Sequence, residues 1–61
     1  MMYHKGQRVR LVGHQTYEGT IVYQWPHDQL VEVRWDQLNP NNAVRMHWPN
    51  EVEPVPPRAR K

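Results

Sequence analysis

Arginines and aromatic residues are the side chains of this chain that could bind a ligand, and the arginines recur in one pattern. Three segments place an arginine between two apolar residues: Val9-Arg10-Leu11, Val33-Arg34-Trp35 and Val44-Arg45-Met46. Guanidinium groups bind phosphate and carboxylate, so the pattern predicts contact with an anionic partner. The candidate binding residues are Arg10, Arg34, Arg45, His47, Tyr17 and Trp25.

Other kinds of active site lack the residues that they need. The chain contains neither cysteine nor serine, so no thiolate ligand and no thiol or serine nucleophile is available. The histidines His4, His14, His27 and His47 show neither the i, i+2 nor the i, i+4 spacing of a local metal site. We therefore predict no catalytic residue, no metal and no cofactor for the binding function.

Short alternating segments predict an all-β fold around these residues. Each segment is rich in β-branched or aromatic residues and stops at turn residues. The expected strands are Arg8–Val12, Gly19–Trp25, Leu30–Trp35 and Ala43–Trp48, with a short fifth at Val52–Val55. Between them, Pro26 and the segment Asn39–Asn42 predict tight hairpins, residues 13–19 a looser loop, and Trp48–Glu51 a single 3₁₀ turn.

The alternation also predicts which side chains are buried. Because side chains of a strand point alternately to its two faces, we expect the apolar members of the three patterns inside and the arginines outside. The predicted core is Val9, Leu11, Val31, Val33, Trp35, Val44 and Met46, joined by Val52 and by either Ile21 or Val22.

Length and charge limit the protein further. A chain of 61 residues forms one domain with a small core, so association with a partner or with further copies would add stability. The net charge of +2 allows a nucleic-acid partner without requiring one. No apolar run is long enough to span a bilayer, and no apolar segment follows the first charges, so we expect a cytoplasmic protein without a membrane partner.

Several segments resemble the SH3-like barrels of the KOW and Tudor type. The likeness rests on Gly6-x-Arg8-Val9-Arg10, Glu18-Gly19-Thr20-Ile21-Val22, Val31-x-Val33-x-Trp35 and Glu51-Val52-x-Pro54-Val55. It implies a five-stranded SH3-like barrel over residues 6–55, with a short 3₁₀ turn before the last strand. Residues 1–5 would form an N-terminal extension, and 56–61 a disordered tail rich in proline and arginine.

A second resemblance, to the plasmid-borne type II dihydrofolate reductases, implies a different function. It rests on Gly6-x-Arg8-Val9-Arg10, on residues 17–22 and on Val44-Arg45-Met46-His47. Those enzymes form a tetramer around one central pore that binds dihydrofolate and NADPH. The family has glutamine and tyrosine where this chain has Arg45 and His47, and these departures favour binding over catalysis.

The sequence thus predicts a small non-enzymatic binding module, as a monomer or a small homo-oligomer. It would contact nucleic acid or a protein through its outward arginines and loop aromatics. Two alternatives stay open: the reductase-like tetramer, and a Tudor-like reader in which Tyr17 or Trp25 helps to bind methylated lysine or arginine.

Overall fold

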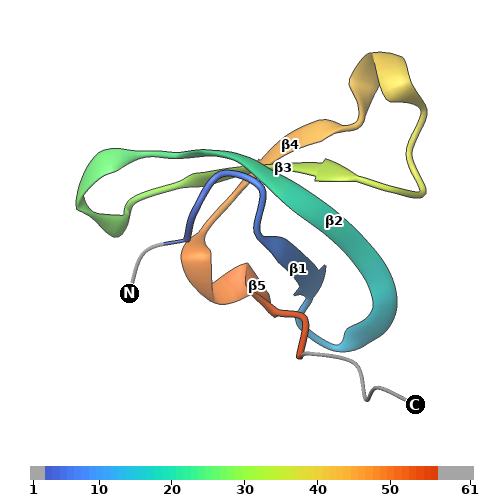
Figure 1. Cartoon of the computed structure of the whole chain (residues 1–61), viewed down its shortest axis with the longest axis horizontal. Helices are drawn as coiled ribbons and strands as arrows, with labels where there is room; N and C mark the ends of the chain where they lie inside the picture. The colour runs from blue at the N-terminus through green and yellow to red at the C-terminus, as the bar shows by residue number, and fades with distance from the viewer. Residues whose placement is uncertain (1–2, 57–61) are drawn as a thin grey trace.

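Five antiparallel strands form one curled sheet in the computed structural model, which describes residues 3–56 (Figure 1). The strands are β1 (Arg8–Leu11), β2 (His14–Gln24), β3 (Val31–Trp35), β4 (Val44–His47) and β5 (Val52–Pro54). They lie in the order β4-β3-β2-β1-β5, and within residues 3–56 no strand pairing joins the two edge strands, so the sheet is not closed. The predicted all-β class and five strands are confirmed.

Three single turns of 3₁₀ helix connect or precede the strands. They are η1 (Pro26–Asp28), η2 (Pro40–Asn42) and η3 (Pro49–Glu51), and each begins with a proline, whose fixed φ suits a first helical position. The turn η3 directly before β5 confirms the predicted 3₁₀ turn. The described residues contain no helix with the length and apolarity that crossing a membrane would require.

The first connection is shorter than expected. Residues 13–19 were expected to form a loose loop, but β2 already begins at His14, and Leu11 pairs with His14. Gly13 has a φ of 86°, which glycine adopts without steric cost, so the chain reverses within two residues. The prediction of a loop was wrong because this tight turn lets the polar residues that follow it join the sheet.

The core lies on the concave side of the sheet, and most of its members were predicted. The buried side chains include Val9, Ile21, Val31, Val33, Trp35 and Val52, while Leu11 is only partly buried. Tyr3 packs against this core from the N-terminal side, and its hydroxyl donates a hydrogen bond to the Val52 carbonyl (3.1 Å). Residues 57–61, most of the predicted tail, lie outside the described residues.

Strand β4 has the opposite orientation to the one predicted. Val44 and Met46 were expected in the core, but their side chains are 41% and 57% exposed. Arg45 pairs with the buried Val33, and directly opposed residues of two strands share a face, so Arg45 lies on the inner side of the sheet. Because side chains alternate between the two faces, a shift of one residue moves every side chain of a strand to the opposite face. The expected pattern buries Val44, whereas the residue that is buried at the start of this segment is Ala43.

Trp35 requires a glycine on the neighbouring strand. Gly19 pairs with Trp35, and a Cβ at Gly19 would lie 2.6 Å from the Arg34 carbonyl oxygen and 2.8 Å from Cε3 of Trp35. Neither neighbour is the end of a flexible chain, so any side chain at Gly19 would push β3 away from β2.

We therefore expect Gly19→Ala to destabilise the fold by about 1–3 kcal/mol through overpacking. Urea unfolding measures the loss. Thr20→Ala on the outer face of β2 is the matched control and should cost less than about 1 kcal/mol, because it removes only an exposed hydrogen bond from Arg8 (2.7 Å). Equal stability of the wild-type chain and Gly19→Ala would contradict this close packing.

Candidate nucleic-acid interface

A pocket of about 400 Å³ lies beside β4, at the edge of the sheet. We call it the Arg45 pocket. Most of its wall is apolar or aromatic, and it contains one permanently charged group, the Arg45 guanidinium. The lining residues are Leu11, Tyr17, Trp35, Leu38, Arg45, Met46 and His47.

An aromatic row forms one wall of the Arg45 pocket. Trp35 stands in the middle, with the Tyr17 ring on one side at 5.0 Å between centroids and the His47 ring on the other at 5.3 Å. Both contacts are edge-to-face, with interplanar angles of 61° and 87°. Trp35 is buried, whereas Tyr17 and His47 are half-buried, so the two outer rings are the ones that a ligand can reach.

The ring of His47 is fixed by hydrogen bonds at both nitrogens. The Trp35 indole N–H donates to His47 Nε2 (3.0 Å), and His47 Nδ1 lies 3.2 Å from Glu51 Oε1. An indole nitrogen can only donate, so Nε2 must accept and Nδ1 carries the proton that faces the carboxylate. His47 therefore orients the wall of the pocket and has no ring nitrogen left for a ligand.

The turn η3 holds this arrangement in place. The Glu51 carboxylate accepts a hydrogen bond from the Trp48 backbone N–H (2.9 Å), while the Glu51 backbone N–H donates to the Trp48 carbonyl (2.9 Å). These two bonds close the turn that follows β4. The Glu51 carboxylate thus has two roles: it closes the turn after β4, and it orients the His47 ring in the pocket wall.

Arg45 has no counter-ion within the described part of the chain. Its side chain is exposed, and no hydrogen bond or ion pair to its guanidinium occurs among residues 3–56. An arginine beside an aromatic wall, with its donors unused, can bind a phosphate or carboxylate while a flat group packs on the rings.

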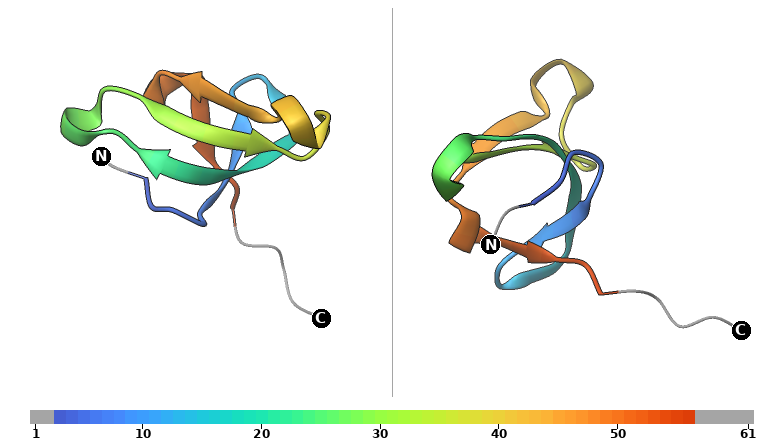
Figure 2. Two further views of the ribbon diagram at one scale, coloured as in Figure 1. Left: turned by 90° about the horizontal axis from the view of Figure 1, so that it is seen from above. Right: turned by 60° about the vertical axis from the view of Figure 1, so that its left-hand side comes forward.

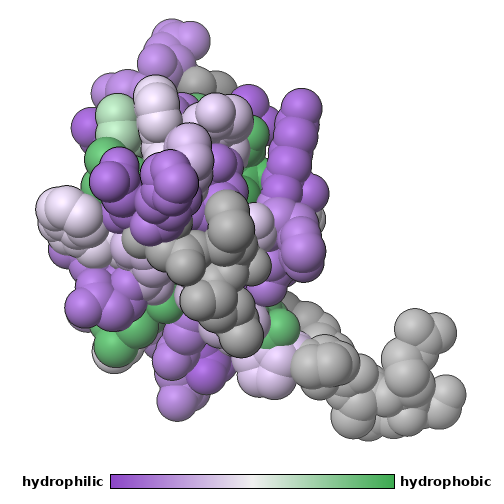
Figure 3. All heavy atoms as spheres, turned by 90° about the vertical axis from the view of Figure 1, so that its left-hand side faces the viewer, coloured by the Kyte–Doolittle hydropathy of each residue, from purple (hydrophilic) through white to green (hydrophobic). Residues whose placement is uncertain are grey.

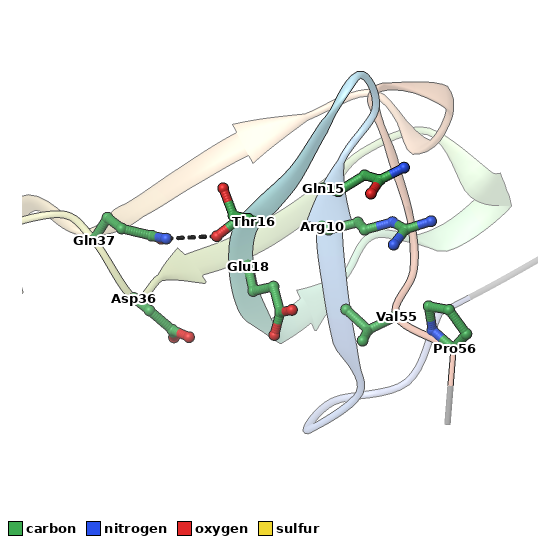
Figure 4. A pocket seen from close by; sticks show the side chains of 8 residues that line it. All are labelled: Arg10, Gln15, Thr16, Glu18, Asp36, Gln37, Val55 and Pro56. Carbon is green, nitrogen blue, oxygen red and sulfur yellow. Dashed lines mark hydrogen bonds between the residues drawn. The ribbon is translucent and has the colours of Figure 1, made fainter. Parts of the chain in front are cut away.

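A larger and more polar cleft of about 590 Å³ lies across the hairpin of β1 and β2 (Figure 4). It contains Arg10 together with the carboxylates Glu18 and Asp36, and two of its lining residues are joined by a hydrogen bond from Gln37 Nε2 to the Thr16 carbonyl (2.7 Å). Arg10 Nε also contacts Glu53 Oε2 at 2.7 Å. The cleft is therefore an internally balanced surface and a poorer site for an anion than the Arg45 pocket.

Arg8 neutralises the carboxylates of that cleft. Its guanidinium contacts both carboxylate oxygens of Asp36, and Nη2 also contacts Glu18 Oε1 (3.1 Å). The hydrogen bond from Arg8 lowers the pKa of Asp36 below its ordinary value of 3.8, against the opposing effect of burial. The same hydrogen bond raises the pKa of Arg8.

Asp36→Asn should reduce the acid sensitivity of folding. Because the pKa of Asp36 is lower in the folded than in the unfolded chain, its carboxylate stabilises the fold above pH 3.8 and stops doing so as the pH falls through the folded-state pKa. The pair is about half exposed, so we expect Asp36→Asn to cost at most about 1 kcal/mol at pH 7. Urea unfolding of both proteins should show this difference shrinking below pH 3.8, and a difference independent of pH would contradict the assignment.

Three of the six predicted binding residues meet in one pocket, and the other three lie elsewhere. Tyr17, Arg45 and His47 meet in the Arg45 pocket. Arg34 lies on the outer face of β3, and Trp25 also lies away from the pocket, where it packs on Tyr23 with 5.1 Å between ring centroids. Tyr17 and Trp25 thus belong to different ring pairs and form no common cage, and Arg10 belongs to the polar cleft.

Sequence reasoning missed the residues that organise the pocket. Trp35 was assigned only to the core, and Glu51 only to a turn, yet both are bonded to His47. The spacing of His47 and Glu51, four residues apart across a proline turn, was the available signal for their contact. Nothing in the sequence indicated the indole hydrogen bond, which depends on the pairing of β3 with β4.

No protein-family model, no curated protein and no solved structure matches this chain. The geometry of the Arg45 pocket and the charges around it are therefore the basis for assigning a function.

We expect His47 to carry its proton on Nδ1 when the ring is neutral. Two-bond ¹H–¹⁵N correlation spectra distinguish the two tautomers by the shifts of the ring nitrogens. His14, which is exposed, serves as the reference within the same spectrum. A neutral His47 protonated on Nε2 would show that the hydrogen bond from Trp35 does not exist in solution.

Proposed function

We propose that this chain is a non-enzymatic, SH3-like binding module that holds single-stranded nucleic acid in the Arg45 pocket. The observation that carries the proposal is an arginine that has no counter-ion among residues 3–56 and lies beside an aromatic wall, within one pocket at a sheet edge. The curled five-stranded sheet with its 3₁₀ turn supports the SH3-like description.

The chemistry of a nucleotide matches the two halves of the pocket. A phosphate oxygen accepts hydrogen bonds from the Arg45 guanidinium, and a base packs against the accessible rings of Tyr17 and His47. Stacking of a base on an aromatic side chain is worth about 1–3 kcal/mol and tolerates any base. A duplex keeps its bases stacked on each other, so the pocket favours a single strand.

The charge distribution limits how strongly such a strand is held. Arg8 and Arg10 are bonded to carboxylates of the chain itself, so they offer little to a phosphate backbone. Arg34 lies on the other face of the sheet. The pocket therefore supplies one strong phosphate contact, and the proposal implies modest affinity with a shallow dependence on salt.

Removing Arg45 tests this directly. For a fluorescent oligothymidylate, we expect Arg45→Ala to weaken binding and to reduce the slope of log K against log salt concentration by about 0.7, the value for one phosphate contact to a single strand. Fluorescence anisotropy at several salt concentrations gives the slope.

Arg10→Ala is the matched control for that measurement. It removes the same charge, but from a guanidinium that is bonded to Glu53, so the slope should stay as in the wild-type chain. Equal slopes for the wild-type chain and Arg45→Ala, or no binding of any single strand, would contradict the proposal.

A reductase-like pore is the second candidate, and one observation favours it. In the resemblance to type II dihydrofolate reductases, Arg45 and His47 stand where that family has glutamine and tyrosine. Both residues line one pocket of this chain. Such an enzyme would be a tetramer and would oxidise NADPH in the presence of dihydrofolate. Sedimentation and a spectrophotometric assay of NADPH would detect these properties, and their presence would replace the binding proposal.

A further inference from the structure

The outer face of β2, β3 and β4 carries apolar side chains that the core does not use. In the left-hand view of Figure 2, these three strands lie side by side. Four large apolar or aromatic residues of this region are exposed, with exposed fractions between 38% and 57%. They are Tyr23, Trp25, Val44 and Met46.

Strand pairing arranges these residues in rows across the sheet. Glu32 stands opposite Tyr23 on β2 and opposite Met46 on β4. In the next row, Arg34 stands opposite Thr20 on β2 and opposite Val44 on β4. Because Val33 between them is buried, Glu32 and Arg34 both lie on the outer face, where Tyr23 and Met46 flank the acidic side chain and Val44 lies on one side of the basic one.

Two other large apolar residues are exposed in the described part of the chain, Val12 and Trp48, and both lie outside these three strands. Figure 3 shows the end that carries the turn between β2 and β3, where most of the visible surface is hydrophilic and the apolar areas are small and separate. A cluster of exposed apolar residues on a soluble domain commonly marks an interaction site. A domain of 61 residues has a small core of its own. Burying an exposed apolar cluster therefore adds a larger share of its stability than it would in a larger domain.

We infer that the outer face of β2, β3 and β4 binds the same face of a second copy of this chain. Two sheets that pack face to face keep their strands roughly aligned. A two-fold axis at Val33 runs the two β3 strands antiparallel and sets Glu32 opposite Arg34 of the partner subunit. The symmetry repeats this pair, so both charges on each face are matched by a second copy.

The contacts within one copy leave these groups available. Glu32 Oε2 accepts a hydrogen bond from the Trp25 indole N–H (3.0 Å), which orients the carboxylate and leaves its other oxygen for the partner's arginine. Among residues 3–56 no hydrogen bond or ion pair reaches the Arg34 guanidinium. A face with unmatched charges of both signs is complementary to its own two-fold copy.

The inference is independent of the proposed nucleic-acid site. Met46 belongs to both regions, because it lines the Arg45 pocket and is exposed on the outer face, whereas Arg45 itself lies on the inner side of the sheet, away from the proposed dimer contact. Self-association is measured without any nucleic acid, so the two proposals can fail separately.

Charge reversal provides the test, by sedimentation equilibrium over a range of protein concentrations. The wild-type chain should approach twice the monomer mass at high concentration. Glu32→Arg and Arg34→Glu should each remain monomeric, because each sets like charges opposite one another. An equimolar mixture of these two variants should again form a dimer, since one copy then presents two positive and the other two negative charges.

Arg45→Glu is the matched control, with the same reversal on the inner side of the sheet, and it should dimerise like the wild-type chain. Near-ultraviolet circular dichroism of the tryptophans checks that each variant is folded. A wild-type chain that stays monomeric at every concentration would overturn the inference. Single reversals that still dimerise, a mixture that stays monomeric, or loss of the dimer in Arg45→Glu would each overturn it as well.

Discussion

The position of Trp35 is the constraint on which the rest of the structure depends. Its side chain is 2% exposed and lies against Gly19 of β2, where no side chain would fit. Its backbone N–H donates to the Ala43 carbonyl (3.0 Å), and its indole N–H donates to His47, so it bonds to the chain at both ends of β4. A single residue therefore joins three strands and also forms the centre of the aromatic wall. The wall of the pocket is therefore anchored in the core.

The sequence predicted the strands and the core better than it predicted the site, and the reason is physical. In β1 and β3 each strand is covered by neighbours, so burial follows hydrophobicity and Val9, Val31 and Val33 lie inside as expected. Strand β4 is an edge strand, and hydrophobicity does not decide its orientation. There the pairing of Ala43 with β3 and the hydrogen bond from Trp35 place Arg45 and His47 inward. These contacts link residues distant in the sequence, which a pattern of alternation cannot show.

Charge pairing separates arginines that look equivalent in the sequence. Arg8 and Arg10 form ion pairs with carboxylates on adjacent strands or turns. The positive charges of these two arginines are therefore neutralised within the chain. Arg34 and Arg45 occupy neighbouring strands but opposite faces, so they do not lie together on the outer face as the repeated pattern predicted. Val44 stands beside Arg34, and aromatic rings line the pocket of Arg45, so a partner that covered either arginine would exclude water and strengthen its ionic contact.

Within the described part of the chain, Arg45 has no counter-ion because of the way in which the adjoining turn is closed. Glu51 follows β4 by four residues, but its Oε1 accepts the Trp48 backbone N–H and faces His47 Nδ1. The acid that could have neutralised the pocket is thereby used to order η3 and to fix the histidine ring. The bonds that close the turn therefore also hold the aromatic wall, and they leave the Arg45 guanidinium without an ion pair to any of residues 3–56.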